Sequence, residues 1–152
     1  MKAKTRLFGE IEIADDKIIH FENGIVGFPD LTDFALIHDA ERTNGIIRWL
    51  QSFQEPNFAM PVMDPLLVKK DYNPQVEEEL LKSIGKLDDE EIFVLVTVTV
   101  PENIKDISVN LRAPIVIHAS NCKAAQIIVD DEQYQVKFPV YEQLQSMKKV
   151  GE

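Results

Sequence analysis

The sequence predicts a mainly β fold: a small antiparallel β-barrel-like single domain with one or two short helices. The chain has 152 residues, and single domains commonly run to about 100–150 residues. About nine short segments combine apolar and β-branched residues with the two-residue period of a strand, and polar turns separate them. Two further segments have the apolar spacing of a helix. Short strands in this number predict a barrel or a folded sheet.

The predicted strands are spread along most of the chain. The strongest is the segment 92–100, in which Ile92, Val94 and Val96 share one face while Phe93 and Leu95 share the other. Because both faces are apolar, we expect this strand to be central. In chain order, the predicted strands cover residues 7–13, 17–21, 34–38, 46–53, 58–63, 92–100, 107–111, 114–118 and 124–129.

Turn residues separate these strands. The pair Asn23 and Gly24 tolerates positive φ, which predicts a turn after the second strand. Residues 28–31, Phe-Pro-Asp-Leu, are expected to open one short helical turn. Residues 41–45 connect two apolar runs and predict a hairpin of 34–38 with 46–53. Pro61 lies within a strand, which indicates an edge or a bulge.

Two helices are predicted. In residues 74–84, Val76, Leu80 and Ile84 recur every four residues, and Asn73 is a suitable N-cap. The tail, residues 140–152, repeats apolar residues at helical spacing and predicts a short terminal helix. We assign residues 1–152 to a single domain.

Composition excludes several classes of function. The net charge is −10 and the pI is near 4.7, so the chain repels phosphate backbones and anionic lipid surfaces. We therefore expect no direct nucleic-acid binding and no membrane association. The longest apolar stretch, 92–100, is far shorter than the roughly 20 residues of a membrane-spanning helix. The single cysteine, Cys122, and the absence of a leader predict a cytoplasmic protein, which we expect to be monomeric when free.

No residue pattern indicates catalysis or a cofactor. The three histidines, His20, His38 and His118, lack the spacing of a helical metal site, and the six glycines form no phosphate-binding loop. We therefore predict no enzyme activity, no metal and no cofactor. The alternative is a small acidic enzyme or ligand-binding barrel that uses Arg112 and Asp64. The simpler roles for Arg112 are a buried ion pair or stacking on Trp49 or Phe53.

One feature rises above background: the charge of residues 71–91. Eight acids and two bases give this segment a net charge of −6. It is either a solvated helix face that keeps the protein soluble or a docking surface for a basic partner. The acids proposed for docking are Asp71, Glu77, Glu78 and Glu79.

A series of motifs goes further. In order, they are FGEIEI at 8–13, IIHFENGIVGFPDLTDF at 18–34, WLQSFQEPNFAMPVMDP at 49–65, VLVTVTVPE at 94–102, NLRAPIVIH at 110–118 and AQIIVDDEQY at 125–134. In this order and spacing the chain resembles the flagellar assembly factor FliW over about residues 7–139. It departs from the family at His118, where members often carry Asn, and at Lys137-Phe138, where they often carry Arg-His.

The resemblance implies a cytoplasmic regulatory protein with two protein partners. One is flagellin, which is held before export. The other is CsrA, a dimeric RNA-binding repressor of flagellin translation, which FliW antagonises once flagellin has been secreted. Flagellin offers terminal segments that are helical in the filament, and an exposed apolar groove is able to capture such a helix. The candidate groove residues are Phe28, Pro29, Leu31 and Phe53.

Overall fold

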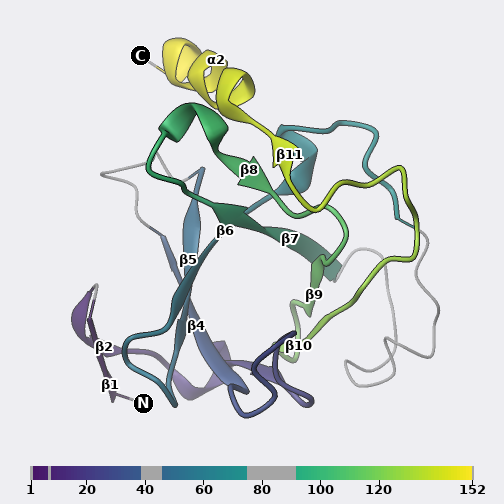
Figure 1. Ribbon diagram of the computed structural model, residues 1–152. Helices are drawn as coiled ribbons and strands as arrows, with labels where there is room; N and C mark the ends of the chain where they lie inside the picture. Colours follow the sequence, from purple (N-terminus) through teal and green to yellow (C-terminus); the bar gives the residue numbers. More distant parts are fainter. Residues whose placement is uncertain (1, 7, 39–45, 75–91, 152) are drawn as a thin grey trace.

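The fold is built around a closed β-barrel. The computed structural model describes residues 2–6, 8–38, 46–74 and 92–151 (Figure 1). Within these residues, seven strands close the barrel, because β7 pairs with β9 at the end of the order β7-β6-β5-β4-β3-β10-β9. These strands are β3 (Ile19–Phe21), β4 (Asp33–His38), β5 (Arg48–Ser52), β6 (Ala59–Met63), β7 (Ile92–Thr99), β9 (Ile115–His118) and β10 (Lys123–Gln126).

The predicted β-barrel is confirmed, with one exception to its antiparallel pairing. All neighbours in the barrel are antiparallel apart from β3 and β10, which pair in parallel through His20 and Lys123. The barrel is therefore mixed. Strands so distant in the sequence leave no local signal of their register, because alternation defines which face is buried and not which strand is the neighbour.

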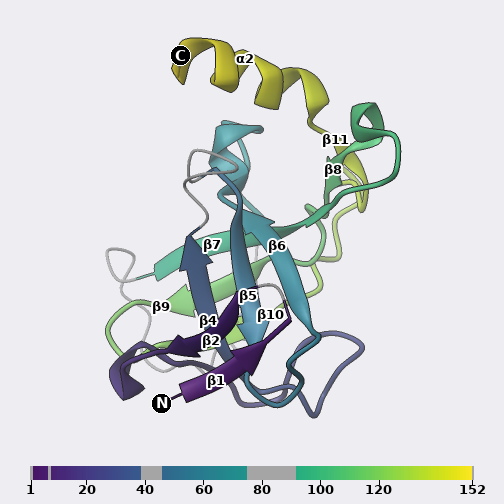
Figure 2. The ribbon, with the colours of Figure 1, turned by 90° about the vertical axis from the view of Figure 1, so that its left-hand side faces the viewer.

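Smaller elements lie outside the barrel. β1 (Lys2–Thr5) and β2 (Gly9–Glu12) form a separate hairpin, and β8 (Ser108–Val109) and β11 (Phe138–Pro139) extend the sheet beyond β7. Three 3₁₀ turns are described: η1 (Asp15–Lys17), η2 (Pro65–Leu67) and η5 (Ile104–Asp106). The helix α2 (Tyr141–Gly151) lies at the end opposite the N-terminus (Figures 1 and 2). No helix of the described residues is long and apolar enough to cross a membrane.

Several predicted elements are confirmed. β4 and β5 form the expected hairpin, and β7 is central, with pairings to β6, β8 and β9. The predicted terminal helix is α2. The predicted helix 74–84 lies outside the described residues beyond Pro74.

Two local predictions need correction. Residues 28–31 form no helical turn: Phe28 pairs with Ile25 as an isolated β-bridge, and the Leu31 amide donates to the Phe28 carbonyl at 3.2 Å in a non-helical turn. Pro61 lies in a strand that has neighbours on both sides, β5 and β7. However, β6 pairs with β7 only through Val62 and Met63, so the missing backbone N–H of Pro61 removes no hydrogen bond to β7.

The core is divided into two large clusters. One fills the barrel and contains Phe21, Phe34 and Leu50, all fully buried. The rings of Phe21 and Phe34 meet edge to face at 5.3 Å. The other lies between β7, β8 and the segment that leads into α2, and it contains Tyr72 and Val140. The barrel therefore has its own packed interior, and the second cluster attaches the outer elements to it.

Candidate partner-binding surfaces

The turn between β3 and β4 presents apolar side chains to solvent. Two hydrogen bonds close it: the Phe28 amide donates to the Ile25 carbonyl at 2.8 Å, and the Ile25 amide donates to the Phe28 carbonyl at 3.2 Å. Gly24 enters the turn with φ +69°, and a Cβ there would lie 2.5 Å from the Pro29 carbonyl oxygen. Only glycine fits this approach. The sequence thus fixes a tight turn with Val26 and Gly27 at its tip and Phe28 as one of the two residues that close it.

Phe28 is held in place although it is exposed. It is 47% exposed, and its ring lies 4.8 Å from that of Phe58. Phe58 ends the loop that follows β5. The side-chain amide of Gln51 in β5 stabilises this loop by donating to the Phe58 carbonyl at 3.1 Å. Val26, 50% exposed, and Pro29 lie beside Phe28 in the chain. We call Val26, Phe28, Pro29 and the underlying Phe58 the Phe28 patch.

The four predicted groove residues do not share one environment. Phe28 and Pro29 are exposed in the turn, whereas Leu31 is half-buried against the barrel core. Phe53 is also half-buried, and its amide donates to the Asp33 carbonyl at 2.9 Å. The sequence reasoning missed Val26 and Phe58, and the run of apolar residues around Gly24 and Gly27 was the signal for Val26.

The acidic run begins on a well-anchored segment. Asp71 is exposed and pairs with Lys69 at 3.1 Å, and the hydrogen bond from Lys69 holds the pKa of this carboxyl below its usual range. The next residue, Tyr72, is buried and donates its hydroxyl to the Leu111 carbonyl at 2.7 Å. Its ring meets that of Tyr134 at 4.9 Å, and burial raises the pKa of the Tyr72 phenol.

Most of the acidic run, residues 71–91, lies outside the described residues. Of its eight acids, Asp71 lies among the described residues, while Glu77, Glu78 and Glu79 lie outside them. The role of these glutamates stays a prediction. What the structure does establish is that residues 69–73 are attached to the second core cluster, so the run starts at a fixed point on the surface.

Arg112 and Asp64 serve separate structural roles. Asp64 caps η2, since its side chain accepts the Leu66 amide at 2.9 Å. The Arg112 Nε donates to the Asp131 carbonyl at 3.4 Å. Trp49, one of the rings considered for stacking on Arg112, meets Phe8 edge to face at 6.3 Å. Three cavities in the described part of the chain are lined by neither Arg112 nor Asp64.

The described histidines are dispersed. His20 pairs with Asp33 at 2.8 Å on the surface. Partial burial raises the pKa of Asp33, but hydrogen bonds from His20 and Gln54 outweigh it, so the net shift is downward. His118 is buried, with Ser120 at 3.0 Å from its Nδ1. In the described part of the chain, no three His, Cys, Asp or Glu side chains are grouped to hold a metal ion.

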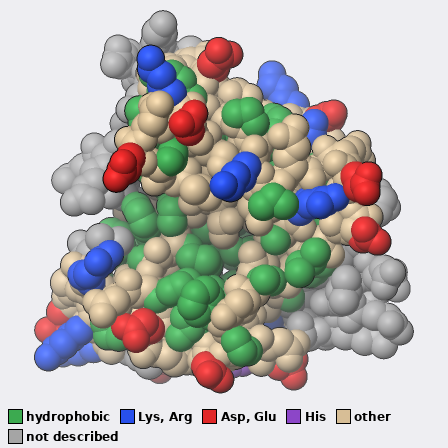
Figure 3. All heavy atoms as spheres, viewed as in Figure 1, with side chains coloured by type: hydrophobic (Ala, Val, Ile, Leu, Met, Phe, Trp, Pro, Cys, Tyr) green, Lys and Arg blue, Asp and Glu red, His purple; other side chains and the backbone are tan. Residues whose placement is uncertain are grey.

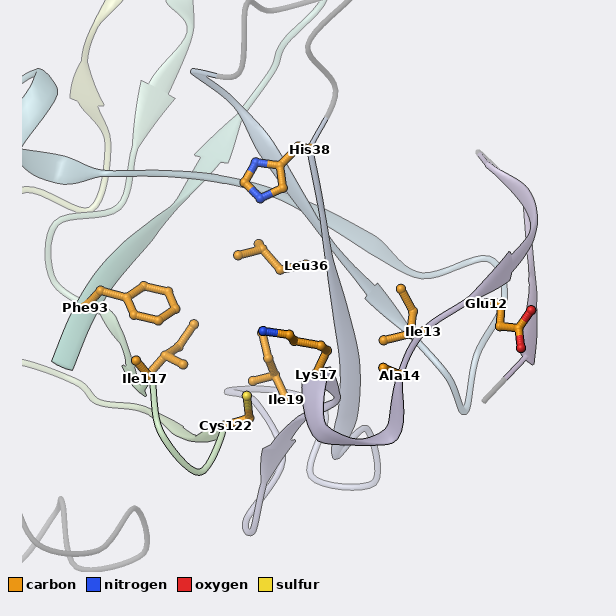
Figure 4. Close-up of a pocket in the computed structure, with 11 residues that line it drawn as sticks. Glu12, Ile13, Ala14, Lys17, Ile19, Leu36, His38, Phe93, Ile117 and Cys122 are labelled. Atoms are coloured by element: carbon orange, nitrogen blue, oxygen red, sulfur yellow. The ribbon is translucent and has the colours of Figure 1, made fainter. Parts of the chain in front are cut away.

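A cavity of about 410 Å³ lies between β4, β9 and the segment around η1 (Figure 4). Its lining includes Cys122 and His38, which are residue types of a nucleophile and a base. Figure 4 shows them at opposite ends, with Leu36 and Lys17 between them. The Cys122 thiol donates instead to the Asp16 carbonyl at 3.3 Å. The cavity therefore assembles no nucleophile and base.

Comparison with known proteins agrees with the motifs. The family described as FliW protein matches residues 2–140. The flagellar assembly factor FliW of Lachnospira eligens is 45% identical over 144 residues, covering 93% of this chain and 95% of that protein. FliW of Lachnoclostridium phytofermentans is 42% identical over 150 residues, covering 98% of this chain and 96% of that protein.

The fold agrees as well. A crystal structure of the flagellar assembly factor FliW superposes with a TM-score of 0.83 at 26% identity, covering 92% of this chain and 96% of that chain. The membership of the FliW family predicted from the motifs is confirmed, and the alternative of a small acidic enzyme is wrong. The chain belongs to the FliW family of flagellar assembly factors, which act without catalysis.

Proposed function

We propose that this protein is a cytoplasmic, single-domain monomer that binds flagellin before export. When it is free of flagellin, it binds and antagonises a CsrA-type RNA-binding repressor. The observation that carries the proposal is the family match over residues 2–140, together with relatives that share most of the chain. Flagellin synthesis would then follow flagellum assembly, because secretion removes the competitor of the repressor.

The charge of the chain supports the repressor as a partner. An RNA-binding protein needs a basic face for phosphates, and a protein of charge −10 is attracted to such a face. Screening limits this attraction to about 8 Å at physiological salt. The acidic run 71–91 therefore has to lie close to the RNA path to reduce RNA affinity without covering the RNA contacts.

The Phe28 patch supports a helical segment as the second ligand. It offers an exposed aromatic ring on a rigid turn, next to Val26 and Pro29. Rigid aromatic anchors are favourable for binding because few side-chain rotations are lost on association. We assign this patch to the amphipathic terminal segments of flagellin.

Surface area allows the two partners to bind at separate sites. Two interfaces of about 800 Å² each would cover about a sixth of the 9471 Å² accessible surface. Opposition between the partners then arises either from overlapping sites or from coupling between distinct ones. These two mechanisms predict different titrations.

The test is calorimetric titration of the repressor into the protein at several fixed flagellin concentrations. We expect the apparent affinity for the repressor to fall as flagellin rises. With overlapping sites the fall continues without limit, whereas coupled sites reach a plateau, typically at about 5- to 150-fold. A ternary complex that forms with undiminished affinity for both partners would refute the switch.

A further inference from the structure

An apolar groove separates α2 from the barrel. Its volume is about 320 Å³, and all but one of its ten lining residues are aliphatic, aromatic or proline. Trp49 and Pro61, paired across β5 and β6, belong to the barrel side. Val100 and Ile104 come from the segment around η5, and Tyr141 and Leu144 come from α2. In the space-filling view, hydrophobic side chains line a hollow below the end that carries α2 and η5 (Figure 3).

The residue that precedes α2 joins this helix to the second core cluster. Val140 is fully buried, and its amide donates to the Ile107 carbonyl at 3.1 Å. The helix then runs across the end of the molecule above the barrel strands (Figure 2). Val100 and Ile104, which line the groove, are 53% and 48% exposed. Adjacent exposed apolar side chains of this kind mark interaction sites more often than single ones.

Two further observations describe what the groove accepts. First, the Trp49 indole N–H and the neighbouring Arg48 Nε are buried without an acceptor in the described chain. Buried donors are normally satisfied, so an occupant that offers an acceptor beside Trp49 would fit this end of the groove. Second, among the residues whose side chains are described, the exposed acids Glu102, Asp106 and Glu142 lie within two residues of lining residues, as do the exposed Lys105 and the half-buried Arg48.

We propose that this groove binds an amphipathic helix of a partner protein, with large aliphatic side chains on one face and Lys or Arg at its flanks. A helix presents apolar anchors at i, i+3, i+4 and i+7, which suits an elongated groove bounded by α2 and a strand pair. The acidic neighbours complement basic flanks. The groove includes neither the Phe28 patch nor the acidic run, so its binding is tested independently of the function proposed above.

The probe is a synthetic peptide of about 18 residues, roughly five helical turns, with a Leu/Ile stripe and Lys elsewhere. Trp49 is the single tryptophan of the chain, so its fluorescence reports directly on occupancy of the groove. Two control peptides share the length: one shuffles the order so that no stripe forms, and one replaces every Lys by Glu. We expect saturable binding of the striped Lys peptide and at least about tenfold weaker binding of both controls.

Variants localise the binding. Ile104→Glu and, separately, Val100→Glu should each weaken the striped Lys peptide by at least about tenfold, because a carboxylate would be buried against its aliphatic face. Both positions are about half exposed, so the fold should be retained, as thermal melts would verify. The matched control is Val136→Glu, at a 52% exposed position outside the groove, which should change the affinity by less than about twofold.

Three results would overturn the proposal. One is equal binding of the striped and shuffled peptides. Another is unchanged affinity in both groove variants. The third is a dimer in sedimentation that Ile104→Glu dissociates while no peptide binds, because a second copy of the chain would then be the occupant. In each case the titration with flagellin and the repressor remains an independent test of the proposed function.

Discussion

Replacing Gly24 with alanine tests whether the turn of the Phe28 patch is fixed by a close backbone approach. The glycine has φ +69°, and an added Cβ would meet the Pro29 carbonyl oxygen at 2.5 Å and the Phe28 carbonyl oxygen at 2.6 Å. Both neighbours are backbone atoms within a turn closed by hydrogen bonds. They cannot move aside as a flexible side chain would.

The chain offers a matched control at Gly9. Its φ is +68°, nearly the same as at Gly24, but nothing lies within 4 Å of an added Cβ. Gly9→Ala should therefore cost only the left-handed conformation, about 1–2 kcal/mol. Gly24→Ala should add the loss of one or two turn hydrogen bonds, each about 0.5–1.5 kcal/mol, for a total of about 1.5–5 kcal/mol.

Urea unfolding of the wild type and both variants measures these costs. For a chain of this size each kcal/mol lowers the melting temperature by about 2–4 °C, so thermal melts should rank the proteins in the same order. Equal destabilisation in Gly24→Ala and Gly9→Ala would refute the close approach as the reason for glycine. If the patch binds flagellin, Gly24→Ala should also weaken that binding at temperatures where the protein is folded.

Four other outcomes are expected. Tyr72→Phe leaves the Leu111 carbonyl without its 2.7 Å donor and should lower the unfolding free energy by about 1–2 kcal/mol; a neutral effect in urea titrations would contradict this. His20 stabilises Asp33 as a carboxylate and holds its pKa below the ordinary value of 3.8. The contribution of Asp33 to the free energy of unfolding is therefore present above pH ~4 and is lost as pH falls through the lowered pKa. The unfolding free energies of Asp33→Asn and the wild type should differ at pH 6 and converge in acid. Changing the glutamates at 77–79 to Lys should slow association with the repressor and flatten its salt dependence; if stopped-flow rates are insensitive to salt in both proteins, the acidic run is only a solubilising face. Thermal melts with and without a strong chelator should coincide, and a drop of several degrees would contradict folding without a metal.

Much of the barrel could be predicted from the sequence because its strands have strong patterns. β7 carries β-branched or apolar residues on both faces. β4 and β5 flank residues whose sequence is typical of a turn. β1 was missed because Lys2–Thr5 contains only one small apolar residue, so its sequence shows no alternation of apolar and polar residues. The pairing of β3 with β10 depends on barrel closure, which local patterns do not encode.

The surfaces were harder to predict than the fold. Phe28 and Phe53 look alike in the sequence, yet Phe28 is exposed and Phe53 is half-buried, because Gly24 turns the chain so that Phe28 comes to lie on Phe58. The groove beside α2 could not be predicted either. It joins Trp49, Val100 and Leu144, which are distant in the sequence and meet only when α2 is attached at Val140.

The Phe28 patch and the groove beside α2 lie at different ends of the molecule, and this constrains how flagellin on the Phe28 patch could act on a partner bound at the far end. The β3–β4 turn is at one end of the barrel, and α2 with η5 is at the other (Figures 1 and 2). Between them lies a core in which Phe21, Phe34 and Leu50 are fully buried, and such close-packed interiors resist gradual deformation. A plateau in the titration with flagellin would therefore require a switching element outside the barrel, and α2, which is joined to the core through Val140, is the described element best suited to that role. A fall without limit would instead place both partners on one shared surface, with no signal passing through the barrel.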